Sequence, residues 1–302
     1  MSYGDPRYGY RNESLGANLF VRAIPILIGL VVIGFTMIRG CQQGPFGRMQ
    51  VVGLDQAQED RLGLQAFQEV LQTSHTIEHG EVVEAVRTVT KRLIRAASEN
   101  ADFQQAVGTP IPKFHWELEV VSDKQVNAFC LPGGKMVVYT AILPVAETDA
   151  GLATVIGHEI SHALAHHGAE RMAQQQMVQI GLTSAGASMG DMDPSKRQQL
   201  LSVLNAGAKF GILSYGRSHE SEADHMGLLL MSAAGYDPHE SIKFWERMTS
   251  ATGSDRQPPE FLSTHPNHQT RIRDLTRWLP DAMRLYENSR YKSQTRMLPE
   301  TN

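Results

Sequence analysis

The sequence of 302 residues predicts an α+β fold, in which a mostly helical domain carries a small β-sheet or hairpin and follows one N-terminal transmembrane helix. Three observations predict this architecture. Several stretches repeat apolar residues at spacings of three and four, as amphipathic helices do. The region 116–143 has a β-type pattern. Residues 23–38 are mostly apolar and contain no charged residue, which favours a membrane segment.

The predicted organisation has five parts. They are a tail (1–22), a transmembrane anchor or signal segment (23–38), a linker (39–54), the main domain (55–279) and a C-terminal tail (280–302). A main domain of this length is a size that one hydrophobic core can support. The linker is expected because residues 42–50 contain glycine and proline.

Three interpretations of residues 23–38 stay open: an uncleaved single-pass anchor, a cleaved secretory signal, or a lipoprotein signal with acylated Cys41. The helical run spans about 24 Å, slightly less than a hydrocarbon core of ~30 Å, and residues 19–21 can extend it if Arg22 snorkels. We favour the anchor, because the apolar run and its flanks are all that an anchor needs, whereas a lipoprotein signal would have the unusual Arg39 just before its cleavage point. Arginines are slightly more frequent before the run than after it, so the main domain is expected on the extracytoplasmic side.

Two helices and a strand are expected in the first half of the main domain. Residues 55–72 and 81–97 have the helical period, and residues 116–121 alternate as a strand does. The second helix has an apolar stripe that is expected to face the core, formed by Val82, Val86, Val89, Leu93 and Ile94.

The sequence His-Glu-Ile-Ser-His at residues 158–162 lies in an apolar helical run. This helix is expected to begin after an N-cap at Thr148 and to end near Gly168. Residues four apart share one helix face, so the imidazoles of His158 and His162 can reach one metal ion. Glu159 can then accept a proton from a water molecule at that ion, which is the arrangement of zinc proteases.

A third metal ligand must come from another part of the chain. His166 continues the spacing, but it would lie about 12 Å along the helix axis from His158. The strongest alternative is Glu220, because Asp224 follows one turn later and can accept the free ring N–H of a ligand histidine. Glu222 is expected on another helix face and ranks lower. The competing interpretation of this segment is an ordinary acidic first turn of a second helix.

Together, the motif at 158–162, the later Glu-x-x-Ala-Asp at 220–224 and the segment Asn-Ala-Phe-Cys-Leu-Pro-Gly-Gly at 127–134 resemble a family of membrane-associated zinc endopeptidases. This is peptidase family M48 of the gluzincin group, which contains the CAAX prenyl proteases, HtpX, BepA and the Oma-type proteases. The resemblance extends over residues 58–279.

The resemblance implies a zincin-like metallopeptidase domain with one zinc ion per chain. His158, His162 and Glu220 would bind the zinc, Glu159 would act as the general base, and Asp224 would support a ligand histidine from outside.

The resemblance also implies roles for two further segments. Residues 215–217 are similar to a Tyr-Ser-Arg sequence of the family, although Gly216 replaces the serine here, so any role of that hydroxyl is in doubt. The match at the other two positions implies that Tyr215 and Arg217 lie near the substrate. His265 matches a histidine that lies close to the metal in the family, where it would act as a switch ligand that blocks the site or as a donor to the transition state.

Residues 127–143 are expected to form a β-hairpin with Gly133 and Gly134 in its turn. An exposed edge strand beside the metal could hold a substrate in extended form, so Asn127, Gly133 and Gly134 are predicted to bind substrate together with Tyr215 and Arg217. The alternative is that the hairpin only covers the core.

Residues 181–194 are rich in glycine, serine, alanine and methionine, and are too polar and broken to span a membrane. Two interpretations stay open: a mobile lid over the cleft, or a plain loop between helices.

These observations predict a zinc-dependent endopeptidase that hydrolyses peptide bonds, with a biological role in membrane or envelope protein quality control. The expected partners are peptide or unfolded protein substrates and the membrane, whereas a net charge of −4 gives no indication of nucleic-acid binding. The alternative is a catalytically silent zinc-binding chaperone or scaffold, and the presence of Glu159 beside a ligand argues against it. The two cysteines, Cys41 and Cys130, are not expected to pair.

Overall fold

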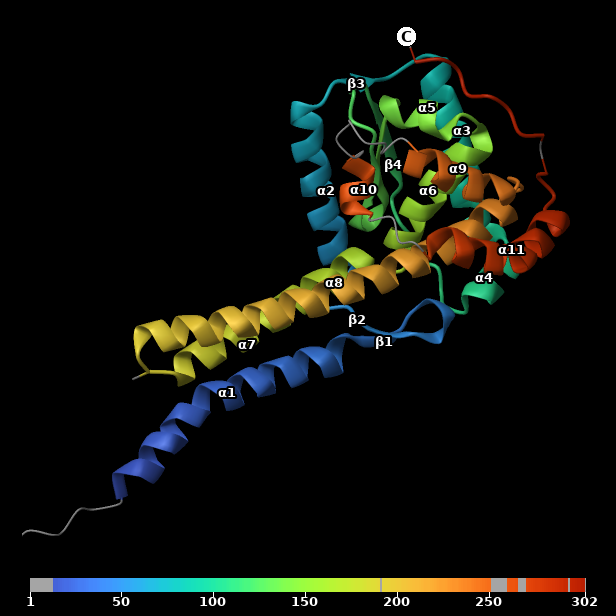
Figure 1. Ribbon diagram of the computed structural model, residues 1–302. Coiled ribbons are helices and arrows are strands. Elements are labelled where there is room, and N and C mark those ends of the chain that lie inside the picture. Colours follow the sequence, from blue (N-terminus) through green and yellow to red (C-terminus); the bar gives the residue numbers. More distant parts are fainter. Residues whose placement is uncertain (1–12, 191, 251–259, 266–269, 293, 302) are drawn as a thin grey trace, which may run out of the picture.

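The computed structural model describes residues 13–190, 192–250, 260–265, 270–292 and 294–301 (Figure 1). A compact domain carries a long arm on one side. The arm is made of α7 (His167–Ser188) and α8 (Pro194–Ala233), and α1 (Glu13–Gly40) runs beside it (Figure 1). The predicted α+β, mostly helical fold is confirmed.

A four-stranded sheet forms one layer of the domain. Its strands are arranged in the order β3 (Thr76–Ile77), β4 (Glu117–Val121), β6 (Lys135–Tyr139) and β5 (Ala128–Leu131). β4 and β6 are parallel, and the other two pairs are antiparallel. The predicted strand and hairpin are therefore confirmed, and β5 lies at an edge of the sheet, as the substrate-binding hypothesis requires.

Both faces of β6 are buried, because helices cover the sheet on two sides. Met136 and Val138 belong to the main core, whereas Val137 and Tyr139 pack with Phe67 on the opposite face. The side chains of a strand alternate between its faces, so one short strand contributes to both cores.

Three predicted helices agree with the structure at their starts. α2 (Gln56–Thr73) begins at Asp55, whose side chain accepts a hydrogen bond from the backbone N–H of Gln58 in a capping box. α3 (Glu81–Glu99) carries the predicted stripe, although Val83 is buried more deeply than Val82. α6 (Asp149–Leu164) runs through the centre of the domain, with nearly all of its side chains buried.

Shorter elements complete the described part of the chain. The helices are α4 (Ala101–Val107), α5 (Leu143–Ala146), α9 (His239–Ser250), α10 (Glu260–Thr264) and α11 (Arg271–Asn288). The 3-10 turns are η1 (Pro45–Gly47), η2 (Pro132–Gly134) and η3 (Thr140–Ile142).

The predicted linker is wrong, because most of it is folded. β1 (Cys41–Gln43) and β2 (Met49–Val51) form an antiparallel hairpin directly after α1. The N–H of Val52 donates to the carbonyl of Gly40 at 2.8 Å, which ties the hairpin to the end of the helix. Glycine and proline here form a tight turn rather than a flexible connection.

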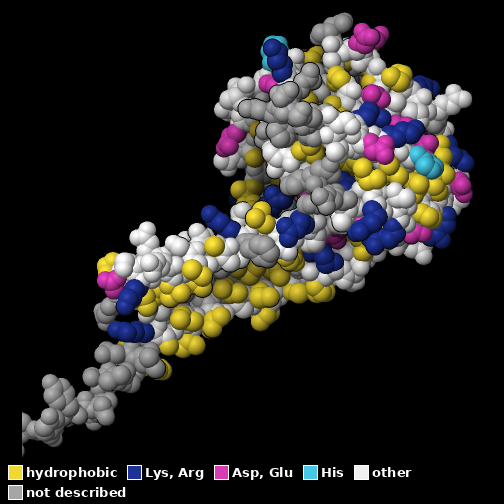
Figure 2. All heavy atoms as spheres, viewed as in Figure 1, with side chains coloured by type: hydrophobic (Ala, Val, Ile, Leu, Met, Phe, Trp, Pro, Cys, Tyr) yellow, Lys and Arg dark blue, Asp and Glu magenta, His cyan; other side chains and the backbone are white. Residues whose placement is uncertain are grey.

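The apolar N-terminal segment is helical and longer than expected. Phe20–Gly40 has a mean hydropathy of 2.3 and only 6% of its best window is buried, so the helix is long and apolar enough to cross a membrane. Its apolar side chains contribute to the hydrophobic surface along the arm (Figure 2). One stretch of the helix packs on α7, where Gly29 lies against Ser184 and Ile180.

The segment 181–194 is neither a lid over the cleft nor a long loop. Residues up to Ser188 continue α7, and α8 begins at Pro194 after a cap by Asp193. The connection therefore lies at the far tip of the arm, away from the domain (Figure 1). Ser184, one of the small residues that suggested a loop, instead lies against Gly29 where α1 approaches α7.

The C-terminal boundary at residue 279 is also wrong. α11 continues through Pro280 to Asn288, since Pro280 is exposed while Ala282 and Leu285 pack into the core. Their burial outweighs the cost of about 3 kcal/mol that proline imposes inside a helix. Further on, the N–H of Asp149 donates to the carbonyl of Arg296, so the expected tail contacts the start of α6.

Candidate active site

The helix α6 carries the His-Glu-x-x-His motif and begins as predicted. The hydroxyl of Thr148 accepts a hydrogen bond from the N–H of Gly151 and caps the helix. The predicted end near Gly168 is wrong, because α6 ends at Leu164. His166 adopts a left-handed conformation (φ 56°) and its ring contacts Glu59 at 3.0 Å, which turns the chain into α7.

α8 crosses α6 at a very short distance, and this contact brings the third acidic residue to the motif. A side chain at Gly227 would lie 2.9 Å from the backbone N of His158, and one at Gly157 would lie 3.2 Å from the carbonyl O of Gly227. Two glycines thus permit the crossing. Glu220 lies two turns before Gly227, in the middle of α8, so the expectation that Glu220 opens a helix is wrong.

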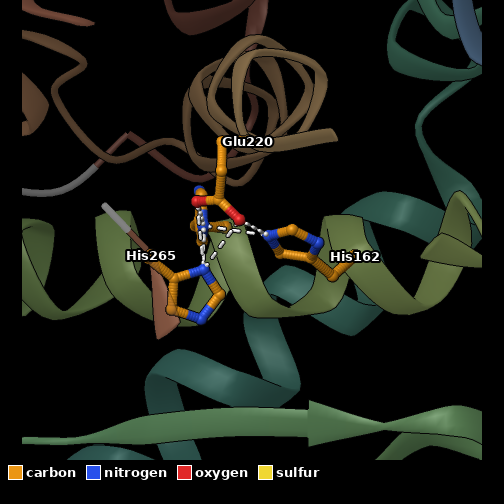
Figure 3. Close-up of side chains that lie close together, drawn as sticks. His162, Glu220 and His265 are labelled. Atoms are coloured by element: carbon orange, nitrogen blue, oxygen red, sulfur yellow. Dashed lines mark hydrogen bonds and ion pairs between the residues drawn. The ribbon is translucent and has the colours of Figure 1, made fainter. Parts of the chain in front are cut away.

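Four side chains from three segments converge at one point: His158 and His162 from α6, Glu220 from α8, and His265 just after α10 (Figure 3). Nε2 of His158 lies 3.1 Å from Nε2 of His162, 3.2 Å from Nδ1 of His265 and 3.4 Å from Oε2 of Glu220. Oε1 of Glu220 lies 3.5 Å from Nε2 of His162, and its Oε2 lies 3.1 Å from Nδ1 of His265. We call these four residues the ligand cluster.

The spacing of these atoms fits a tetrahedral metal site. Ligand atoms at about 2.05 Å from a tetrahedral ion lie about 3.3 Å from one another, close to each of the distances above. Imidazole nitrogen and carboxylate oxygen are also the donors that zinc takes.

The charges around the ligand cluster favour a cation. Burial lowers the pKa of His158, but Asp224 and Glu220 more than offset this effect and raise it to about 10. Burial opposes the ionised form of Glu220, yet His162, His158 and His265 hold the pKa of its carboxyl below the ordinary value. Burial also holds the pKa of His162 well below the usual range, which favours the neutral ring.

Asp224 lies behind His158, one of the predicted metal ligands. Its Oδ1 lies 3.0 Å from Nδ1 of His158, which favours a proton on that nitrogen and a lone pair on Nε2. The buried Arg271 was not predicted. Its Nε donates to Oδ2 of Asp224 at 2.5 Å and its Nη2 donates to Oε2 of Glu220 at 3.0 Å, while its guanidinium stacks on Trp245. Helical spacing in α11 gave no signal for this long-range bridge.

Glu159 has the surroundings of a proton acceptor. Its Oε2 accepts a hydrogen bond from the N–H of Cys130 in β5 at 3.3 Å. Its buried Oε1 accepts no hydrogen bond from the described residues and lies 3.3 Å from Nε2 of His265. Burial raises the pKa of Glu159 above its ordinary value, although His265 and His158 act in the opposite direction. A carboxylate with a raised pKa and a free lone pair can accept a proton at neutral pH.

Three of the five predicted substrate-binding residues lie in or next to the β5–β6 hairpin. Asn127 precedes β5, and its side-chain oxygen accepts a hydrogen bond from the N–H of Ala128. Gly133 and Gly134 form the turn with φ of 74° and 79°. Both glycines are buried, and a side chain at Gly133 would collide with Asp60 of α2. The structure therefore explains these glycines by close packing, and their contact with substrate stays a prediction.

The other two predicted substrate-binding residues lie outside the ligand cluster. The hydroxyl of Tyr215 donates to Oε1 of Glu170 at 3.1 Å, and Arg217 is exposed on α8. Glu222, which ranked below Glu220 as a ligand, contacts Arg48 and His167 instead of the cluster.

Comparison with known proteins agrees with this geometry. The sequence pattern of peptidase family M48 matches residues 87–279. The mitochondrial metalloendopeptidase OMA1 of Schizosaccharomyces pombe is 41% identical over 175 residues, which cover 58% of this chain and 50% of that protein. OMA1 of Saccharomyces cerevisiae is 34% identical over 239 residues, with coverage of 74% and 62%. The beta-barrel assembly-enhancing protease of Escherichia coli K12 is 32% identical over 174 residues, with coverage of 56% and 34%.

The chain thus spans about half to three fifths of the length of the two fungal relatives. The matched family range covers more than half of the 302 residues and contains the complete ligand cluster together with Glu159 and Asp224. On this match the chain belongs to peptidase family M48.

Proposed function

We propose that this chain is a zinc-dependent endopeptidase. The observation that carries the proposal is the convergence of the ligand cluster at tetrahedral spacing beside the buried carboxylate of Glu159. His158, His162 and Glu220 would hold the zinc ion, and Asp224 would orient His158. A zinc ion bound there supplies Lewis acidity, which activates water and polarises the scissile carbonyl.

The residues of the chain perform the proton transfers. Glu159 takes a proton from the attacking water at its free Oε1 and passes it to the leaving amine. The N–H of Cys130 holds the other carboxylate oxygen, so the acceptor stays oriented toward the site. Arg271 fixes Glu220 and Asp224 in place and keeps two buried negative charges compensated.

The free edge of β5 would position the substrate. The N–H of Cys130 points away from β6 and toward Glu159, so this edge runs beside the ligand cluster. An extended peptide that adds to the edge as a further strand would present its carbonyl groups there. Asn127, Gly133 and Gly134 would then act by shaping this strand and its turn, and Tyr215 and Arg217 would contact substrate farther from the metal.

His265 would set the resting state of the enzyme. Its Nδ1 occupies the fourth corner of the ligand cluster, and its Nε2 lies 3.3 Å from the proposed base. A catalytic zinc site keeps one position open, so His265 must leave this corner before water can be activated. We therefore favour the blocking role for His265 over that of an oxyanion donor.

Proteolysis of an unfolded protein tests the proposal. Full-length protein in detergent should degrade casein, lose this activity to a chelator and regain it with zinc. The alternative is a zinc-binding chaperone or scaffold, which would bind casein and suppress its aggregation without cutting it. Intact casein after incubation with zinc-loaded protein, and also with its zinc-loaded His265→Ala variant, would exclude the endopeptidase and favour that alternative.

We further propose that the enzyme is a single-pass membrane protein with its catalytic domain on the extracytoplasmic side, acting on unfolded membrane or envelope proteins. The exposed apolar helix α1 and the name of the bacterial relative support this role. Mass spectrometry of the N-terminus distinguishes the alternatives. An intact end at Met1 or Ser2 supports the anchor, an acylated Cys41 end supports a lipoprotein, and an unmodified internal end supports a cleaved signal.

A further inference from the structure

A second buried polar network lies directly behind His162. We call it the outer cluster, and its members are Arg48, His167, Glu170, His219 and Glu222. All are buried except Arg48, whose side chain is 25% exposed. The proposed proton transfers use none of these residues, and the helical spacing of the motif predicts none of them.

The hydrogen bonds of the outer cluster have a defined direction. Nε2 of His162 faces the ligand cluster, so the single proton of the neutral ring must sit on Nδ1. That nitrogen lies 2.9 Å from Nδ1 of His167, which must therefore accept. The proton of His167 is then on Nε2, which donates to Oε2 of Glu222 at 3.0 Å. A carboxylate thus selects the tautomer of one histidine, and that histidine selects the tautomer of the next.

Arg48 holds the carboxylate at the end of this chain of hydrogen bonds. Its Nε donates to the same Oε2 of Glu222 at 2.9 Å, and its Nη1 and Nη2 donate to the two oxygens of Glu170 at 2.9 Å each. A guanidinium is a planar fork that can satisfy two carboxylates in one geometry. Glu170 also accepts from Nε2 of His219 at 2.9 Å, which fixes it from the other side.

Arg48 comes from an unexpected part of the chain. It lies in the hairpin between β1 and β2, which directly follows the apolar helix α1. Its own backbone is fixed, because its carbonyl accepts from the N–H of Gly44 at 2.7 Å and its N–H donates to the carbonyl of Pro45 at 3.1 Å. The hairpin therefore presents the guanidinium to α7 and α8 from a rigid turn.

We propose that Arg48 is a positioning residue for the metal ligand His162. Arg48 holds Glu222, Glu222 orients His167, and His167 directs the metal-binding lone pair of His162 into the site. The hairpin after α1 would thereby support the metal centre, although none of its residues belongs to the ligand cluster. This inference rests on the proposed function, because it requires that His162 binds the ion.

Zinc affinity of the full-length protein in detergent tests this inference. Competition with a chelator should show zinc binding weakened by about 10–100-fold in Arg48→Ala, the usual loss when a ligand histidine loses its outer partners. Arg48→Lys should recover part of the loss, since an ammonium keeps the charge but lacks the fork. With cobalt(II) in place of zinc, the visible bands of Arg48→Ala should shift, because the ring of His162 changes its orientation.

Arg247→Ala is the matched control. The side chain of Arg247 is 23% exposed and donates to the carbonyls of Val145 and Ala146, neither of which belongs to the outer cluster. This variant should lower the melting temperature while its zinc affinity and cobalt spectrum stay those of the parent.

A double-mutant cycle tests whether Arg48 acts through Glu222. Glu222→Gln should weaken zinc binding, and Arg48→Ala should add little in that background. Fully additive losses, or parental zinc affinity in Arg48→Ala, would overturn the inference. If Arg48→Ala does not fold, Arg48→Lys and Glu222→Gln decide, since both keep the size of the side chain.

The parent protein and His158→Ala separate this inference from the proposed function. If the parent protein binds no zinc, or if His158→Ala binds zinc normally, both the proposed metal centre and this inference are wrong. If zinc binding of the parent protein depends on His158 but Arg48→Ala binds zinc as tightly as the parent does, only this inference is wrong.

Discussion

At the scale of single residues, a substitution of Glu159 is expected to separate catalysis from metal binding. It lies next to His158 in the chain but is not a member of the ligand cluster. Glu159→Gln keeps the shape and can still accept from the N–H of Cys130, but it cannot take a proton. We expect full zinc occupancy and a loss of casein hydrolysis by about 10²–10⁴-fold. Hydrolysis near the parental rate would contradict the proposed base.

Asp224 supports His158 and is held by Arg271. Asp224→Asn removes the charge that favours the Nδ1–H tautomer of His158, so zinc affinity should fall by about 10–100-fold in a chelator competition. Asp281→Asn is the control, because Asp281 is exposed and pairs with Arg284 on α11, outside the ligand cluster. Equal zinc affinity in the two variants would argue against the supporting role.

His265 has two possible functional roles that predict changes of opposite sign. If His265 is a blocking fourth ligand, His265→Ala should raise the initial rate of casein hydrolysis while zinc occupancy stays high. As an oxyanion donor, the same change should lower kcat by about 10²–10³-fold. Unchanged kcat and unchanged zinc affinity would leave His265 with a structural role only. Pro266, which follows His265 and as a proline disfavours helical geometry there, lies outside the described residues.

At the scale of elements, the crossing of α6 and α8 determines whether the site can form. A side chain at Gly227 would lie 2.9 Å from backbone N of His158, and backbone cannot move aside as a flexible side chain can. Gly227→Ala should therefore destabilise the fold by about 1–3 kcal/mol and weaken zinc binding, because Glu220 moves away from the histidines. Chemical denaturation and chelator competition measure the two effects.

Gly207→Ala on the same helix is the control for Gly227→Ala. Nothing lies within 4 Å of a side chain added at Gly207, so this substitution should leave zinc affinity unchanged and raise stability by up to about 1 kcal/mol. If both alanines had the same effect, the close crossing would not be the cause.

At the scale of the whole molecule, α1 is expected to anchor the enzyme in the membrane. Leu27 and Val31 lie on one exposed side of the helix, with 52% and 72% exposure. Each arginine at the centre of a membrane span costs about 2.5–3.5 kcal/mol. The double variant Leu27→Arg, Val31→Arg should therefore become extractable from membranes by alkaline carbonate, whereas Leu27→Ile, Val31→Leu should not. Retention of the arginine variant would indicate another membrane-binding surface.

Elements with a strong local signal could be predicted from the sequence. The helix that starts after residue 55, the cap at Thr148 and the alternation of residues 116–121 each depend on neighbours in the chain. Where tertiary packing competes with the local signal, the prediction was wrong. α11 continues past the predicted boundary at residue 279, because buried residues beyond Pro280 hold the helix, and residues 39–54 fold because their turn packs on α7 and α8.

The sequence by itself determined the pairing of His158 with His162 and the place of Glu159, because helical periodicity puts residues four apart on one face. It also ranked Glu220 above Glu222 as the predicted third ligand. Only the tertiary structure shows where the two carboxylates lie, since the crossing at Gly157 and Gly227 turns Glu220 toward the histidines and leaves Glu222 with Arg48. Arg271 and Arg48 likewise reach the site from distant segments. Such contacts depend on how closely elements approach and in which register, and no local spacing encodes either quantity.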